Sequence, residues 1–344
     1  MNHRVLVSVS VLTVLIAVMF VAAMPAAGQN GSAPARTGGT PAKAYRAPRT
    51  PDGQPDLQGF WTNTTYTPLE RPKNVTKDFF TKEEAIEIAK QAAEVEEGQT
   101  EPGTIADVHY DFTQFALDRS HGAGAVLNLR SSMIVDPPDG KIPPMTAEGQ
   151  KRTAERAEAR RRIGAITDSV QNEPLSVRCI IMDRAGPPML PGAYNNNYQI
   201  VQAPGYVMIL VEMIHDVRII PLDGRSHLPQ DIRQWSGDYV GHWEGETLVV
   251  ESTNFTDKTR FQGSSQNMKL IERFTRLADD TIRYQFTIDD PATWTRPWSA
   301  ELPMKKTIGP LFEHACHEGN YALTNTLAGA RAEEKRAAAG KVTK

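Results

Sequence analysis

The chain has 344 residues, of which 40% are hydrophobic, and its formal net charge is −3. This length fits one large domain or two small ones, with enough apolar residues for a core. The charge is too mild for a nucleic-acid-binding protein or a highly acidic solvating protein, so we expect no nucleic-acid partner.

The first 28 residues have the pattern of an export signal. Arg4 precedes an apolar run from Val5 to Ala23, and small residues at 26–28 offer a peptidase site. We predict a signal peptide over residues 1–28, cleaved near Gly28, and a periplasmic or secreted protein without membrane contact after cleavage. The alternative is a retained anchor, because the run approaches the length of a spanning helix. Removing this leader, with one basic residue and no acid, changes the net charge from −3 to −4.

The N-terminal part predicts a linker followed by helices. Residues 29–56 are rich in Gly, Pro, Ala, Ser and Thr, which is typical of a flexible linker. Residues 57–170 are interpreted as a helical and turn-rich part that packs on the core. A capping box of Thr81 and Glu84 predicts a helix over 81–97, and a second, largely polar helix is expected from Thr146 to Arg162.

Residues 171–330 are predicted to form an antiparallel β core. Short strands are expected, after a first one at 126–135, at Val177–Met182, Asn197–Gln202, Tyr206–Met213, Val217–Leu222, Tyr239–Trp243, Thr247–Ser252, Lys269–Leu277 and Thr281–Ile288. Such strands without intervening long helices indicate a mainly β (α+β) protein, an antiparallel barrel, lipocalin-like, or a sandwich. Regularity fades after Thr295, and a helix from Tyr321 to Ala338 and a charged tail over 331–344 end the chain.

Two strands indicate which side chains face the core. In the expected strand Thr281–Ile288, the residues Ile282, Tyr284, Phe286 and Ile288 alternate with polar residues. This pattern predicts one face buried in the core and one face exposed to solvent. The segment Val207–Val211 is apolar at every position. We therefore expect that strand to be buried on both faces, with N-terminal helices covering the outside of the sheet.

The sequence has two cysteines, Cys179 and Cys316. In an oxidising compartment an even pair is most simply a disulfide, and we predict that bond here. The alternatives are two buried thiols, or Cys316 acting as a nucleophile beside His314 and His317.

Several short segments of the sequence are similar to segments of a protein family. They are Pro48–Gly53, Ile134–Gly140, Tyr194–Gln202, Arg218–Gly224 and His242–Val250. Over roughly residues 48–327 the chain resembles an uncharacterised family of exported proteins common in soil bacteria. The resemblance implies a bacterial origin and secretion, and it brings no catalytic residues. The chain departs from the family pattern at Asp238-Tyr239, where Asp-Ser is expected.

The first candidate site combines Glu212, His215 and Arg218. A carboxylate that follows an apolar strand is poorly hydrated, which raises its pKa and suits a general acid or base, with His215 as its proton partner. The structural alternative is that Glu212 pairs with Arg218 across a hairpin.

The second candidate lies around Cys316. His317 and Glu318 are catalytic candidates, because a bridge to Cys179 would hold them against the core. His314, His317 and Glu318 are ligand types that suit zinc. His314 and His317 are three residues apart, however, so an extended chain points them to opposite sides, and we predict no metal site. The structural alternative is a C-terminal loop that the disulfide holds in place, without a catalytic role.

The third candidate is aromatic and amide-rich. Trp294, Arg296 and Trp298 alternate, which predicts a ladder on one face, and Trp235, Tyr239 and Trp243 suggest another. Such side chains bind ligands or fill the core, and core packing is the more common role. The ligand-binding candidates are therefore Tyr194, Asn195, Asn197, Arg218, Trp235, Trp243, Trp294 and Trp298.

The sequence lacks a Gly-rich phosphate loop, a Gly-x-Ser-x-Gly motif, a Cys-x-x-Cys pair and a haem attachment motif. We therefore expect no cofactor. The leading hypothesis is an exported protein that binds a small organic ligand or a glycan in the interior or at the rim of a barrel. The alternatives are a cofactor-independent lyase, isomerase or hydrolase that uses Glu212, His215 and His317, and a structural envelope protein. The sequence leaves the oligomeric state open.

Overall fold

A computed structural model describes residues 45–97, 126–163, 166–182, 185–192, 194–258 and 261–342. The predicted signal peptide, its cleavage point near Gly28 and residues 29–44 of the predicted linker lie outside the described residues. Within the described ranges, no helix is both long and apolar enough to cross a membrane.

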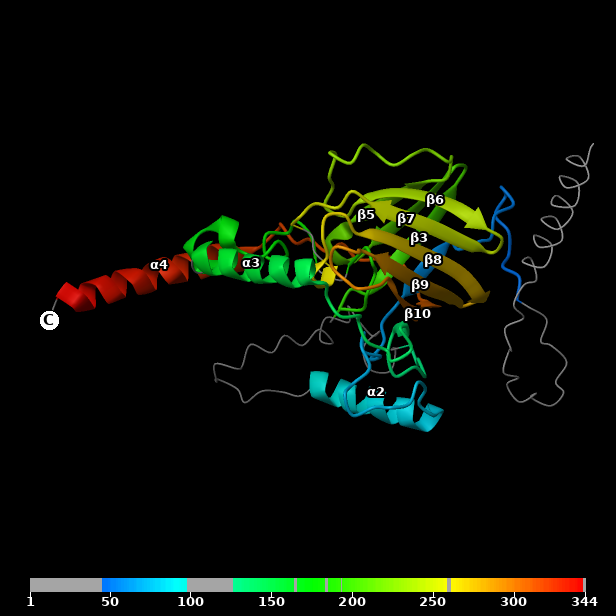
Figure 1. Cartoon of the computed structure of the whole chain (residues 1–344), viewed down its shortest axis with the longest axis horizontal. Helices are drawn as coiled ribbons and strands as arrows, with labels where there is room; N and C mark the ends of the chain where they lie inside the picture. Colours follow the sequence, from blue (N-terminus) through cyan, green and yellow to red (C-terminus); the bar gives the residue numbers. More distant parts are fainter. Residues whose placement is uncertain are drawn as a thin grey trace, which may run out of the picture. The chain divides into compact units, whose positions relative to one another are not determined.

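Among the described residues, ten strands form one antiparallel sheet that curls into a nearly closed barrel (Figure 1). The strands are β1 (Gly59–Thr62), β2 (Ile134–Asp136), β3 (Asn197–Ala203), β4 (Tyr206–Val211), β5 (Val217–Pro221), β6 (Asp238–Glu244), β7 (Thr247–Thr253), β8 (Lys269–Ala278), β9 (Thr281–Asp289) and β10 (Trp298–Lys306). Their order is β5-β4-β3-β1-β10-β9-β8-β7-β6, and β2 pairs with β10. The predicted antiparallel barrel is confirmed, and the sandwich alternative is not.

The barrel closes through side chains where β5 meets β6. The guanidinium of Arg218 on β5 lies 4.9 Å from the ring centroid of Tyr239 on β6. Gly241 on β6 brings the strands close, because a Cβ there would lie 2.6 Å from Ile220 Cγ2 and 2.8 Å from Leu222 Cδ2. Glycine is therefore needed at this position for the two edge strands to meet.

Alternating side chains fill the core as expected for β9. Ile282, Tyr284, Phe286 and Ile288 are each at most 1% exposed, which confirms the predicted inward face. The expectation for 207–211 is wrong in part. Val207, Ile209 and Val211 point into the core, but Met208 and Leu210 are half-buried, since the outer face of β4 is incompletely covered.

The strands that sequence analysis missed are β1 and β10. β10 pairs with β9 from Trp298 opposite Ile288 to Lys305 opposite Thr281, although it contains Pro303. Two predicted strands are absent or much shorter than expected. Residues 177–182 form a turn and irregular chain. Of residues 126–135, Ile134 and Val135 belong to a strand, β2. β1 belongs to the sheet itself, although its residues precede the predicted core.

The expected helices are present. α2 (Lys82–Glu97) has its capping box: Glu84 N–H donates to Thr81 Oγ1 at 3.2 Å, and Thr81 N–H donates to Glu84 Oε2 at 2.8 Å. α3 (Ala147–Ile163) begins where Gly149 N–H donates to Thr146 Oγ1 at 3.0 Å. α4 (Tyr321–Val342) continues through most of the expected tail. Short 3₁₀ helices include η3 (Ile166–Asp168), η4 (Val170–Asn172), η5 (Met213–His215) and η6 (Phe261–Gly263).

Candidate ligand-binding site

A buried ion pair occupies the interior of the barrel. Arg218 donates a hydrogen bond of 3.0 Å to Glu272 Oε1 and a second one to Oε2, and both side chains are at most 1% exposed. Tyr284 donates to the same Oε1 at 2.7 Å. The ring centroid of Tyr239 lies 4.9 Å from the Arg218 guanidinium, and Tyr284 packs on the buried ring of Phe274 with centroids 5.0 Å apart, so side chains fill the middle of the barrel. The interior is thus unavailable as the ligand site that the sequence suggested.

The interior network keeps its charges compensated. Burial alone would lower the pKa of Arg218, but the charge of Glu272 overrides it and raises the pKa above its ordinary value. Burial, and then the charge of Glu272, raise the pKa of Tyr284 well above its ordinary value. Arg218 is therefore a structural residue of the interior and not a ligand-binding residue at a surface.

Residues 185–192 plug one end of the barrel, which we call the mouth. At the mouth β1, β7 and β9 end, and β3, β8 and β10 begin. Met189 is fully buried, its N–H donates to the Tyr284 hydroxyl at 2.9 Å, and its carbonyl accepts from Asn63 Nδ2 at 3.2 Å. The Met189 N–H is thus hydrogen-bonded to β9, and the Met189 carbonyl is hydrogen-bonded to Asn63, the residue that follows β1.

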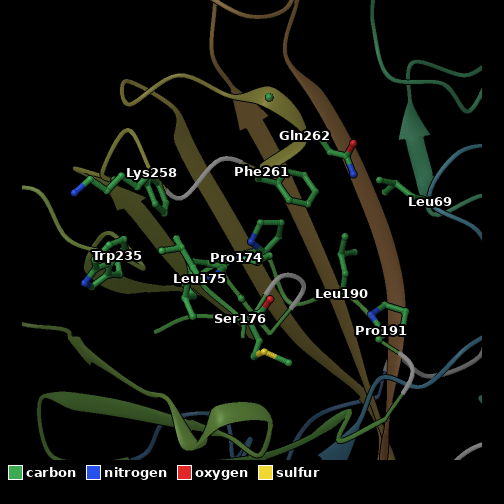
Figure 2. Close-up of a pocket in the computed structure, with 18 of the residues that line it drawn as sticks. Leu69, Pro174, Leu175, Ser176, Leu190, Pro191, Trp235, Lys258, Phe261 and Gln262 are labelled. Carbon is green, nitrogen blue, oxygen red and sulfur yellow. The ribbon is translucent and has the colours of Figure 1, made fainter. Parts of the chain in front are cut away.

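A cavity of about 1750 Å³ lies at the mouth, outside the plug (Figure 2). Its wall combines residues 64–69 and most of 171–182 and 186–192 with the segments before β6, after β7 and before β8. The wall mixes apolar and polar side chains. Its large apolar members are Leu69, Met133, Met145, Leu175, Ile180, Ile181, Met182, Leu190, Phe255, Phe261 and Met268, and Thr, Asn, Gln and Ser side chains lie among them. The cavity is therefore a hollow of mixed polarity that the mouth loops build.

The wall of the cavity is continuous with the core through Phe261. Its ring stacks on Trp298 with centroids 6.0 Å apart, and it meets Phe286 edge-on at 6.4 Å. Figure 2 shows Phe261, Pro174 and Leu190, which all line this cavity. Because Trp298 and Phe286 are fixed in the barrel, the aromatic wall has a rigid support.

Polar and charged groups lie among and around these apolar residues. Lys258 Nζ lies 5.8 Å from the ring centroid of Trp235, which is 38% exposed, and Figure 2 shows both at the same edge of the cavity. Arg160 and Arg178 also line the cavity. Glu173 is its one buried acid among the described residues, at 5% exposure.

Of the predicted ligand-binding residues, only Trp235 is among the described lining residues of this cavity. Trp294 and Trp298 are buried in the core, edge to face, with centroids 5.7 Å apart. The expected ladder with Arg296 is wrong, because Arg296 turns outward and binds Asp136 at 2.6 Å. Trp243 is half-buried on β6.

The side-chain amides of Asn196 and Asn197 form hydrogen bonds within the protein. Asn196 is buried and bonds to the backbone of Gly192, with its Oδ1 accepting at 2.6 Å and its Nδ2 donating at 3.1 Å. Asn197 Nδ2 donates to Glu212 at 2.7 Å. Asn195 has a φ of 55°, and Tyr194 stacks on His314 with centroids 6.4 Å apart. This loop therefore shapes the mouth through internal contacts.

The catalytic candidates differ in burial. Glu212 is 3% exposed and accepts hydrogen bonds from Asn197 and from Phe312 N–H at 3.1 Å, so the alternative that it pairs with Arg218 is wrong. His215 is exposed, with Nδ1 3.1 Å from His314 O. His317 and Glu318 are exposed just before α4.

His314 is the histidine of this region with a shifted pKa. Burial, helped by nearby His215, lowers the pKa of His314 below its ordinary value. Among the described residues, no three His, Cys, Asp or Glu side chains gather to hold a metal ion.

The predicted disulfide between Cys179 and Cys316 is confirmed. It joins a turn of the cavity wall, which includes Arg178 and Ile180, to the segment before α4. Asn320 Nδ2 adds a 2.9 Å hydrogen bond to Val177 O. The bond is compatible with an oxidising compartment outside the cytosol.

Glu173 and the mouth loops are the parts of this cavity that the sequence did not predict. Their residues come from segments distant in the chain, and only the closed sheet brings them together. The sequence signal that could have indicated Glu173 is its place in Asn172-Glu173-Pro174, an acid before a proline in a segment with few other charges.

Comparisons with known proteins give limited information. No known protein family matches the chain, and no curated protein matches it. A secretary abundant heat soluble (SAHS) protein from Ramazzottius varieornatus is 12% identical, covering 32% of this chain and 70% of its own, with a TM-score of 0.22. A variant of the fluorescent protein UnaG is 14% identical, covering 39% of this chain and 86% of its own, with a TM-score of 0.21. Such scores support no functional conclusion, and the barrel follows from the strand order of this chain.

Proposed function

We propose that the protein binds a small organic ligand in the cavity at the barrel mouth. The observation that carries the proposal is the cavity itself, about 1750 Å³, with large apolar side chains and polar groups in its wall. Pockets that bind drug-sized ligands typically measure about 300–1,000 Å³, so this cavity is larger than such a pocket. The mouth therefore has room for a bulky or elongated molecule.

An apolar ligand fits this wall better than a glycan. Four methionines line it: Met133, Met145, Met182 and Met268. Thioether side chains adapt to apolar ligands of varied shape. Of the tryptophans predicted to stack on a sugar, Trp235 alone lines the cavity among the described residues, and Lys258 lies over its ring. A glycan remains an outcome of the test.

The enzyme alternative has less support. Both carboxylate oxygens of Glu212 accept hydrogen bonds from the protein, which suits a residue that holds β4 to the 312 segment. His317 is exposed, so it has no buried environment in which to transfer a proton. The predicted export, periplasmic or secreted, accords with a disulfide-bonded binding protein.

Binding is tested with Nile red, a neutral dye that fluoresces in apolar surroundings. Titration of Nile red with the wild-type protein is expected to raise the fluorescence of the dye until the signal saturates. Ser176→Trp places an indole ring in the wall of the cavity, where Ser176 is half-buried, and is expected to weaken dye binding at least about tenfold, or about 1.4 kcal/mol. The matched control is Ser226→Trp on an exposed loop.

The proposal fails if the wild-type protein does not bind the dye, or if the two variants bind it equally. Thermal unfolding of each variant verifies that it is folded. Stabilisation by cello-oligosaccharides in the absence of dye binding would favour the glycan instead, since a true ligand raises the unfolding temperature by mass action.

A further inference from the structure

We propose that Glu173 anchors the ligand by accepting a hydrogen bond from a protonated amine at the end of an apolar body. The inference rests on the proposed function and names the chemical class of its ligand. It concerns a residue that belongs neither to the interior ion pair nor to the predicted catalytic set.

The carboxylate of Glu173 has an unused hydrogen-bonding capacity. The residue lines the cavity and is 5% exposed. Its Oε1 is buried and has no hydrogen-bond partner among the described residues. Burying a carboxylate without a partner is unfavourable, and native proteins rarely do so without a functional reason. A donor on a ligand would reach the carboxylate at its other oxygen, Oε2, which is less buried and to which no described residue donates.

The backbone holds Glu173 in a fixed position. Its N–H donates to Val170 O at 3.2 Å at the end of η4, and its own conformation is extended, with φ −66° and ψ 146°. Pro174 follows Glu173 in the chain. The turn after it leads to the disulfide-linked segment, and in this turn Ile180 N–H donates a 2.9 Å hydrogen bond to Leu175 O. An anchor placed in advance loses little conformational freedom when it binds.

Basic side chains also line the cavity. Whether they pair with Glu173 decides if the site favours a positively or a negatively charged ligand. Arg160, Arg178 and Lys258 line the cavity, but among the described residues none of them forms an ion pair with Glu173. Arg160 and Lys258 are exposed, and Lys258 lies over Trp235. Water therefore screens these two charges, whereas Glu173 is buried. Arg178 is half-buried and is the group that an anionic ligand would select instead.

A charged donor on the ligand suits the site better than a neutral one. Hydrogen bonds between an ammonium and a carboxylate are shorter and about twice as strong as neutral ones. The methionine and phenylalanine side chains of the wall would hold the apolar body of the same ligand. The expected ligand class is thus an amphiphilic amine.

The experiment compares three probes of equal chain length, decylamine, decanoate and decyltrimethylammonium, each below its micelle concentration. Each probe displaces Nile red from the wild-type protein, from Glu173→Gln and from the control Glu83→Gln on α2, whose side chain is exposed and does not line the cavity. We expect decylamine to bind the wild type at least about tenfold more tightly than decanoate, and Glu173→Gln to lose about tenfold for decylamine alone. Decyltrimethylammonium, which has no N–H, is expected to be intermediate and less sensitive to the substitution.

The outcomes separate this inference from the proposed function. If Nile red binds but Glu173→Gln leaves decylamine affinity unchanged, the anchor is wrong while the cavity remains a binding site. Tighter binding of decanoate than of decylamine would overturn the inference in favour of Arg178. If Nile red does not bind the wild type, the proposed function itself fails. Equal Nile red affinity of Glu173→Gln and wild type verifies that the variant keeps its cavity.

Discussion

The hydroxyl of Tyr284 accepts a 2.9 Å hydrogen bond from Met189 N–H and donates a 2.7 Å one to Glu272. A single oxygen thus joins the plug at the barrel mouth to the ion pair in the interior. Because Leu190, beside Met189, lines the cavity, the shape of the proposed ligand site depends on a bond inside the barrel.

Tyr284→Phe is predicted to destabilise the protein by about 1–3 kcal/mol, because it leaves Met189 N–H buried without an acceptor and removes a donor from Glu272. Chemical denaturation measures the change. The control is Tyr206→Phe, whose exposed hydroxyl accepts a 3.2 Å hydrogen bond from Arg225 and is expected to matter little. Equal stability of the two variants would show that the plug is held by other contacts.

Glu272→Gln is predicted to cost about 3–5 kcal/mol, since Arg218 would remain charged and buried without its partner. The free energy of unfolding, from denaturant titration, measures this cost. Replacing both residues, with Arg218→Met and Glu272→Leu, should recover much of the loss. The control Glu244→Gln breaks the exposed pair with Arg273 and should change stability by at most about 1 kcal/mol. A small effect of Glu272→Gln would contradict the ion pair.

The predictable part of the fold lies where side chains alternate locally. β8 and β9 alternate buried and half-buried residues over most of their lengths, so the sequence was enough to locate them. β10 has the same alternation but contains Pro303, which cannot donate to a ladder, and it follows an irregular stretch. β1 has only four residues, too few to show a period.

The candidate site was harder to predict because its residues are neighbours only in the folded chain. The disulfide could be predicted from compartment and parity. The partner of Arg218 could not, since Glu272 lies 54 positions away and faces it across the barrel. Trp294 and Trp298 attracted attention by their size, yet size is also what makes aromatic residues suit the core.

Gly241→Val is predicted to open the barrel between β5 and β6. Its side chain would overlap with Ile220, which is fully buried, and with Leu222, and overpacking of this kind costs about 1–3 kcal/mol. Denaturant titration measures the loss. Gly329→Ala is the matched control, because no atom lies within 4 Å of its added Cβ in α4. If both variants are as stable as the wild type, the two edge strands do not meet closely.

Removing the disulfide is predicted to destabilise the protein and to loosen the cavity wall. Cys179 and Cys316 are 137 residues apart, and closing a loop of that size is worth roughly 4–5 kcal/mol in the chain-entropy model. Unfolding of a Cys179→Ser/Cys316→Ser variant measures this loss, and its Nile red affinity should fall with it. Thiol titration of the unfolded, non-reduced wild type should find no free thiol, and finding two would refute the bond.

Stability is predicted to fall in alkaline solution above about pH 10. Burial raises the pKa of Tyr239 to about 12, against the lowering effect of Arg218. Below the ordinary value of about 10, Tyr239 is protonated in both the folded and the unfolded protein, so its full contribution is present. Between about 10 and 12 only the unfolded chain loses the proton, so the free energy of unfolding decreases as the pH rises. Tyr239→Phe should make this decrease shallower in urea titrations from pH 9 to 12, whereas the exposed Tyr321→Phe should not. Identical pH profiles for the two variants would contradict the assignment, and tyrosinate absorbance near 295 nm reports the ionisation directly.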